Sequence, residues 1–193
     1  MTMSILHTCI RFIIGRSTGM LSRFGRSRHG IAAVEFAIVL PFMALLYLGG
    51  FEVTQEIAIN RLVVLSASTV ANLVTQYSSI SASQTMPDIL NASAVVLTPY
   101  SAANAVVTVS CITIDSKGNA TIAWSQALNG TARTTGQSVN LPAALDVPNT
   151  TVVWGETTYK YTPPVNFLNL ASSTVYSTVY MLPRANGTIT LTP

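Results

Sequence analysis

The chain has 193 residues, of which 49% are hydrophobic and only 9% are charged. Ordinary soluble domains carry roughly 25% charged residues, so Ser, Thr and Asn must solvate much of this surface. The length leaves room for one domain plus an appendage. The two cysteines, Cys9 and Cys111, lie far apart and lack neighbours at metal-ligand spacing, which argues against a disulfide framework or a cysteine metal site.

The positive charge is concentrated at the amino terminus. Residues 1–29 hold five arginines and no acidic residue, whereas residues 30–193 hold five basic and seven acidic ones, a net charge of −2 (5 − 7). Such a terminus can bind nucleic acid or anionic lipid. Because an apolar run follows directly, Arg23, Arg26 and Arg28 favour a role in membrane topology. We therefore expect no nucleic-acid partner.

The apolar run extends from Gly30 to Phe51, and Glu35 is its only charged residue. As a helix it would be about 33 Å long, which is enough to cross a bilayer. We predict a cytoplasmic leader over residues 1–30 and a transmembrane helix over 31–51, with everything beyond exported. The rival interpretation is a cleaved secretory signal. The run exceeds the usual apolar length of such signals, and the sequence "YLGG" lacks the small-x-small cleavage pattern.

Glu35 is the costly feature of this segment. An acidic residue at the centre of a bilayer costs about 2.5–3.5 kcal/mol, and less near the ends. Glu35 would lie about 7.5 Å inside the span, so snorkelling or protonation is one explanation. Farther along, Pro41 predicts a bend because it removes a backbone donor.

The residues around Glu35 offer a second explanation. Gly30, four apolar residues and then Glu35-Phe36 resemble the processing site of type IV prepilins, in which a membrane peptidase cuts after the glycine. The resemblance implies cleavage between Gly30 and Ile31. Glu35 would then pair with the new amino terminus of an adjacent subunit, and this pairing would offset much of the desolvation cost.

The longer stretch "GIAAVEFAIVLPFMALLYLGGFE" resembles the TadE/TadG group, the pilin-like proteins of the tight-adherence (Tad, or Flp) pilus system. Pro41 lies six residues after Glu35, as in that group, and "YKYTPP" (159–164), Phe167 and "YMLPR" (180–184) resemble its distal pattern. The 30-residue leader is longer than is common. Either Met20 is the true start, or the leader is an uncut anchor.

This resemblance implies a function. The chain would be a minor pilin-like (pseudopilin) subunit that takes part in assembly of a Tad/Flp-type pilus, without a cofactor. It would lie in the bacterial inner membrane with a periplasmic or extracellular carboxyl-terminal domain. Its partners would be other pilin-like subunits, the assembly platform proteins and, for a cut leader, a prepilin peptidase. The alternative is a generic single-pass anchored domain that binds a ligand through its sheet.

Beyond the span, residues 52–82 continue a helical pattern. Their apolar stripe recurs at steps of three and four: Ile59, Val63, Ala67, Val70, Val74 and Tyr77. The stripe can pack on the chain's own β-rich domain, residues 87–193, which we call the head, or on neighbouring subunits. The helix is expected to end in the Ser-rich turn "SSISASQ".

Residues 87–193 read as strands. Six segments are rich in Val, Thr, Ile and Tyr: "AVVLTPY", "AVVTVSCITID", "ATIAWSQA", "TTVVWGETTYKYT", "STVYSTVYML" and "TITLTP". "DSKGN" predicts a hairpin turn and residues 130–149 a long surface loop. We predict an α+β fold with an antiparallel sheet, in which most Trp and Tyr side chains form core contacts or cross-strand pairs.

The exported part offers no constellation for catalysis. Both histidines precede the span, and no catalytic triad, phosphate-binding glycine loop or metal cluster is recognisable. Thr157 and Lys160 are the nearest approach to a nucleophile and base, but a strand would separate them. Asp146 and Glu156 are expected to be solvated. We therefore expect that the chain is not an enzyme.

Overall fold

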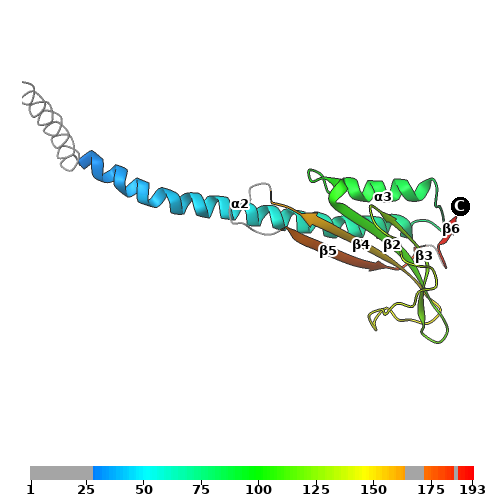
Figure 1. Ribbon diagram of the computed structural model, residues 1–193. Helices are drawn as coiled ribbons and strands as arrows, with labels where there is room; N and C mark the ends of the chain where they lie inside the picture. The colour runs from blue at the N-terminus through cyan, green and yellow to red at the C-terminus, as the bar shows by residue number, and fades with distance from the viewer. Residues whose placement is uncertain (1–27, 164–171, 185–186) are drawn as a thin grey trace, which may run out of the picture. The chain divides into compact units, whose positions relative to one another are not determined.

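The computed structural model describes residues 28–163, 172–184 and 187–193 (Figure 1). Two of the predicted topology residues, Arg23 and Arg26, lie outside this part, as do Pro164 and Phe167 of the distal pattern. The chain divides into two units, residues 1–51 and 52–193, which are described separately. The predicted α+β class is confirmed, because a long helix precedes a four-stranded antiparallel sheet.

Helix α2 extends from Arg28 to Thr75 and contains Pro41. It ends seven residues before the predicted end at residue 82. The Ser-rich segment predicted as a turn instead contains strand β1 (Ser79–Ser81), which pairs in parallel with β6 (Thr190–Thr192). Ile80 explains the difference, since its side chain is buried in the core and holds this strand in place.

Helix α3 (Thr85–Val95) corrects a second prediction. The segment "AVVLTPY" was expected to be a strand, but its first residues close this helix and the rest forms turns. Ile89, Leu90 and Ala94 are buried at helical spacing. Tertiary burial of this face thus overrides the β-propensity of the two valines.

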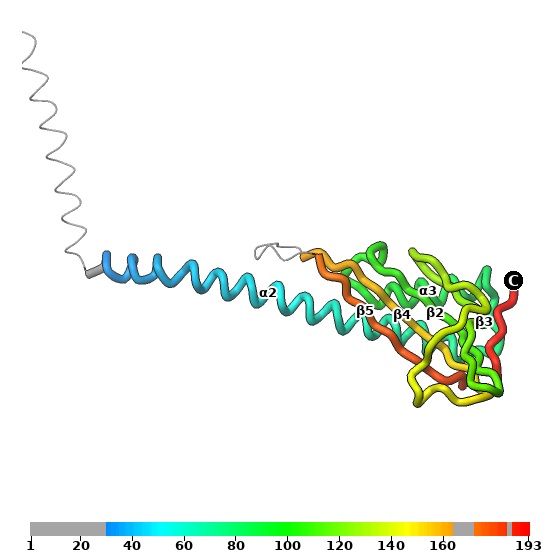
Figure 2. Tube along the Cα trace, turned by 60° about the horizontal axis from the view of Figure 1, so that its bottom comes forward, coloured from blue at the N-terminus to red at the C-terminus, as the bar shows by residue number. Residues whose placement is uncertain are grey.

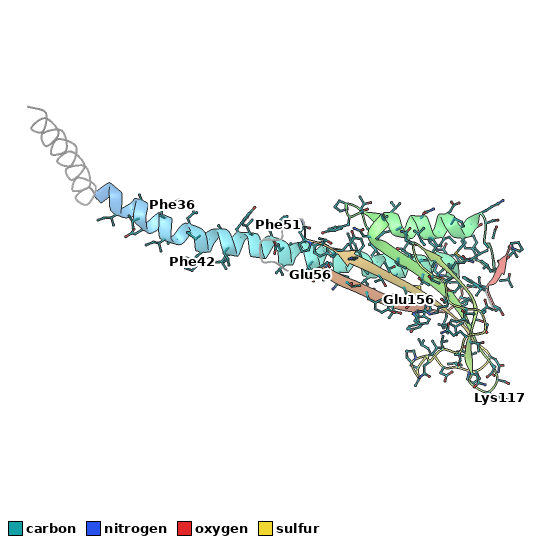
Figure 3. The ribbon with its side chains drawn as sticks, viewed as in Figure 1. Phe36, Phe42, Phe51, Glu56, Lys117 and Glu156 are labelled. Atoms are coloured by element: carbon teal, nitrogen blue, oxygen red, sulfur yellow. The ribbon has the colours of Figure 1, made fainter. Side chains whose placement is uncertain are left out.

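The sheet contains four strands in the order β3-β2-β4-β5, and all neighbours are antiparallel. The strands are β2 (Ala105–Ile114, preceded by the 3-10 turn η1, Ala102–Asn104), β3 (Ala120–Leu128), β4 (Thr151–Tyr161) and β5 (Ser173–Met181). The predicted "DSKGN" hairpin joins β2 to β3, with Lys117 near its tip (Figure 3). These strands confirm four of the six predicted strand segments, and β6 falls within the last of them, "TITLTP".

The main core lies between one face of this sheet and two helices, α3 and the part of α2 after residue 52 (Figure 1). Five of the six predicted stripe residues on α2 are fully buried, namely Ile59, Val63, Ala67, Val70 and Val74. Tyr77 lies beyond the helix and is exposed. This part of the stripe therefore packs on the chain's own head.

The other face of the sheet carries a second, smaller core. Ile112, Ile122 and Val152 are buried there against Val139 and Leu141 of the loop that connects β3 to β4. Figure 2 shows this connection in yellow. Three backbone hydrogen bonds tie residues 136–139 to the first half of β3, so the predicted surface loop is fastened along the sheet.

Candidate functional site

The amino-terminal part of α2 is an apolar helix with exposed side chains. Every residue from Ile31 to Tyr47 is exposed, including Phe36 (66%) and Phe42 (68%), which project from the helix in Figure 3. Monomeric soluble proteins rarely expose so large a continuous apolar surface. Within the part of the chain that the structure describes, α2 is the one helix long and apolar enough to cross a membrane.

The predicted processing residues lie in the first turns of this helix. Arg28 is its first residue, Gly30 is half-buried, and Ile31 and Glu35 are exposed. Ile31 and Glu35 are four residues apart, so they share one face at about 6 Å along the axis. A carboxylate at this position can form an ion pair with the charged amino terminus of a neighbouring chain. Cleavage at Gly30 and the pairing of Glu35 stay predictions.

The part of α2 after residue 52 is fixed to the head by polar contacts as well as by its apolar stripe. The hydroxyl of Ser66 donates to the carbonyl oxygen of Ser93 at 2.8 Å, and the Ser66 and Thr157 hydroxyls lie 3.2 Å apart. All three residues are buried. These contacts join α2 to α3 and to β4, so they hold this half of the helix rigidly on the head.

A polar cluster on the other face of the sheet was not predicted. Glu156 was expected to be solvated, and this prediction is wrong, because only 7% of the residue is exposed. Its carboxylate forms a bidentate ion pair with the Arg133 guanidinium. The hydroxyl of Tyr176 donates to the same carboxylate at 2.7 Å. Burial and this hydrogen bond raise the pKa of Tyr176. Figure 3 shows Glu156 on the sheet.

Aromatic side chains complete this cluster. The Arg133 guanidinium lies 3.8 Å from the centre of the Trp154 ring, and Trp154 stacks on Tyr180 with 5.5 Å between ring centres. Trp154 and Tyr180 are register partners on β4 and β5, which confirms the expected cross-strand pairing. One feature of the sequence could have indicated this cluster. Trp154 and Glu156 are two residues apart in a predicted strand, so their side chains lie on the same face. The partner arginine comes from the loop and has no such signal.

These contacts join β4, β5 and the loop between β3 and β4, so the cluster contributes to the stability of the head. Thr157 is buried against α2, whereas Lys160 is exposed. An offset of three residues puts their side chains on opposite faces of β4, so the structure separates this pair. In the described ranges, no three His, Cys, Asp or Glu residues cluster as metal ligands would.

Comparison with known protein families gives a match that lies on helix α2. Residues 30–71 match the family model of the TadE-like proteins. This segment is therefore similar to the TadE-like proteins. The match confirms the resemblance to the TadE/TadG group and covers the exposed apolar segment together with most of the half that packs on the head. No curated protein and no solved structure matches the chain.

The TadE-like segment thus combines two environments on one helix. Its first half exposes apolar side chains on all sides, and its second half buries one stripe against the sheet. A helix that is apolar on all sides needs lipid or protein around it. The first half of the TadE-like segment is consequently the candidate site, and Glu35 is the charged residue in it.

Proposed function

We propose that the chain is a minor pilin-like subunit that takes part in assembly of a Tad/Flp-type pilus. The observation that carries the proposal is the TadE-like match over a helix whose first half is exposed, apolar and interrupted by one carboxylate. In this proposal residues 31–51 span the bacterial inner membrane, the amino terminus lies in the cytoplasm, and the head lies in the periplasm or outside the cell.

Glu35 is the residue on which assembly depends in this proposal. A carboxylate facing lipid is stabilised when a cation neutralises it, and the amine of a neighbouring subunit cut after Gly30 supplies that charge. Other pilin-like subunits and the assembly platform are the expected partners. A prepilin peptidase would act first, and the subunit itself would have no catalytic role.

The direct test replaces Glu35 by glutamine in the full chain in its own cells. The change keeps the shape and removes the charge, so surface pili are expected to be lost while the protein still reaches the membrane. Glu56→Gln is the matched control, because Glu56 lies exposed on the same helix beyond the predicted span. Pili that form normally with Glu35→Gln would contradict the proposal.

A second test determines the mature amino terminus. The protein is purified from membranes, and its mass and first residue are measured. We expect Ile31 as the first residue, and Gly30→Leu should block the cut. A chain that still begins at Met1 or Met20 would contradict cleavage and the pairing of Glu35 with a neighbouring terminus. It would leave membrane anchoring intact.

A further inference from the structure

A groove lies between the first turns of α2 beyond the predicted span and the turn that follows α3. Helix α2 contributes Ile57, Ala58 and Leu62 to its lining, and the turn contributes Pro99 and Tyr100. Its volume of about 580 Å³ is ordinary for a site that binds a small molecule. All of these residues belong to the second unit of the chain, residues 52–193. The groove is therefore complete within one unit.

The contacts of Tyr100 fix the shape of the groove. The Tyr100 hydroxyl donates to Oε1 of Gln55 at 2.7 Å, which ties the turn to α2. The ring of Tyr100 packs edge-on against Tyr159 and Tyr161 of β4, with ring centres 6.3 and 6.2 Å away. Both of these β4 residues are buried. The turn is thus held in place from two sides, and the groove is formed before any ligand enters it.

Arg61 is the one charged residue that lines this groove. It is exposed, and it is the only basic residue within residues 30–116. Among the described residues it forms no ion pair, because the salt bridge found there joins Arg133 to Glu156. Glu56 precedes Arg61 by five residues, which is about 140° around the helix axis, and does not line the groove. An unpaired cation on an apolar surface fits an anionic ligand with an apolar part.

The neighbours of Arg61 on α2 suit the boundary of a membrane. Val53 and Ile57 follow the predicted span, and both are apolar and about half exposed. Arg61 lies one turn, about 6 Å, beyond Ile57. The headgroup layer on each side of a bilayer is about 5–7 Å thick. Because helical side chains tilt toward the amino terminus of their helix, the predicted orientation directs this guanidinium toward the headgroups.

We propose that the groove binds an anionic phospholipid of the membrane that α2 spans. The Arg61 guanidinium pairs with the headgroup phosphate, and the apolar part of the lipid packs against Ile57, Leu62 and Pro99. A headgroup of net negative charge is preferred, because the choline of a zwitterionic lipid competes with Arg61 for the phosphate. The inference rests on the membrane span of the proposed function and adds a lipid site directly beyond it.

The test places the full chain in lipid nanodiscs of phosphatidylcholine that contain increasing fractions of phosphatidylglycerol. Hydrogen exchange of the Tyr100 amide, which donates to the Leu97 carbonyl oxygen in the turn, reports on the groove. We expect phosphatidylglycerol to protect this amide in a saturable way. Arg61→Gln should raise the fraction required for half-maximal protection about fivefold, which is what one cation near an anionic surface contributes.

Matched variants separate the charge of Arg61 from the shape of the groove. Arg61→Lys keeps the charge and should retain most of the response. Lys117→Gln removes one positive charge from an exposed residue in the β2–β3 hairpin and should respond like the parent (Figure 3). Ala58→Phe fills the groove without a change of charge and should weaken the response. Thermal melting in phosphatidylcholine alone checks that each variant is folded.

Four outcomes would overturn the proposal. Equal responses of Arg61→Gln and the parent would place the lipid elsewhere. Equal protection by phosphatidylcholine alone would exclude recognition of negative charge. Protection by inorganic phosphate in detergent micelles would make the ligand a free anion. Protection that increases with protein concentration in micelles without phosphatidylglycerol would make the occupant a second copy.

This experiment also separates the lipid site from the proposed function. No other pilus component takes part in it, so it does not depend on the Glu35 experiment. A chain that fails to insert into nanodiscs would contradict the membrane span itself. A chain that inserts but shows no effect of phosphatidylglycerol would contradict only the lipid site.

Discussion

Gly155 of β4 lies so close to Ala67 of α2 that an added Cβ would stand 2.6 Å from the Ala67 carbonyl oxygen. The same atom would meet the Ala71 Cβ at 2.9 Å. Neither neighbour is the end of a flexible side chain. The helix can rest on the sheet at this point only because the strand residue has no side chain.

Gly155→Ala is accordingly expected to destabilise the head by about 1–3 kcal/mol, the usual cost of overpacking a core. Thermal unfolding followed by near-ultraviolet circular dichroism of the tryptophans measures the change. Gly50→Ala is the control, since nothing lies within 4 Å of its added Cβ. A Gly155→Ala protein that melts like the parent would show that the helix can shift freely.

The ion pair of Arg133 and Glu156 is predicted to fasten the β3–β4 loop. Glu156→Gln removes the charge that faces the guanidinium, and we expect the free energy of unfolding to fall by about 1.5–3 kcal/mol, since hydrogen bonds to charged groups contribute this much. Hydrogen exchange at Gly136 and Val139 should accelerate, because these amides hold the loop to β3. Lys117→Ala, a change of an exposed cation in the β2–β3 hairpin, should leave that exchange unchanged. Unchanged exchange in Glu156→Gln would exclude the fastening role.

Cys111 is predicted to resist thiol reagents in the folded chain. It is fully buried, and burial raises the pKa of its thiol to about 11 from 9.0. The neutral thiol favours the folded state, so this contribution is complete below pH 9 and is lost as the pH rises through about 11. In a Cys9→Ser chain, alkylation at pH 8 should require denaturant. Rapid labelling without denaturant would show that the core opens locally.

The Asp115 carboxylate is predicted to stabilise the turn of the β2–β3 hairpin through its hydrogen bonds to Lys117 and Asn119. The pKa of this carboxyl is lowered, chiefly by hydrogen bonds from the Asn119 side chain and backbone amide. Slight desolvation opposes the shift, and a hydrogen bond from the Lys117 amide adds to it. Its contribution is therefore present above the ordinary pKa, about 3.9, and is lost as the pH falls through the lowered value. The Lys117 and Asn119 amide resonances should shift with that titration. Asp115→Ala should abolish the shift, and a shift that persists would assign it to another group.

Much of the fold is readable from local patterns. The apolar run and the stripe at Ile59, Val63 and Val70 predict α2, and the Val- and Thr-rich runs predict β2 to β5. Errors occur where distant contacts decide. Strand β1 exists because β6 pairs with it, and α3 exists because Ile89 and Leu90 are buried on the sheet. No local signal contains those partners.

The candidate sites divide in the same way. Glu35 stands out from the sequence because a carboxylate in an apolar run contradicts its surroundings whatever the fold. Glu156 does not stand out, since an isolated acid on a strand is ordinarily solvated. Its burial depends on Arg133, which reaches it from a loop 23 residues away.

The sequence alone determined where the apolar helix lies, which residue within it is charged, and that strands follow, because periodicity and transfer free energies act on neighbouring residues. Contacts within the folded head placed α2 against Gly155, laid a loop over the second face of the sheet and left β5 as an edge strand. Those features depend on contacts between residues distant in the chain, and close packing selects such contacts only once the whole head is assembled.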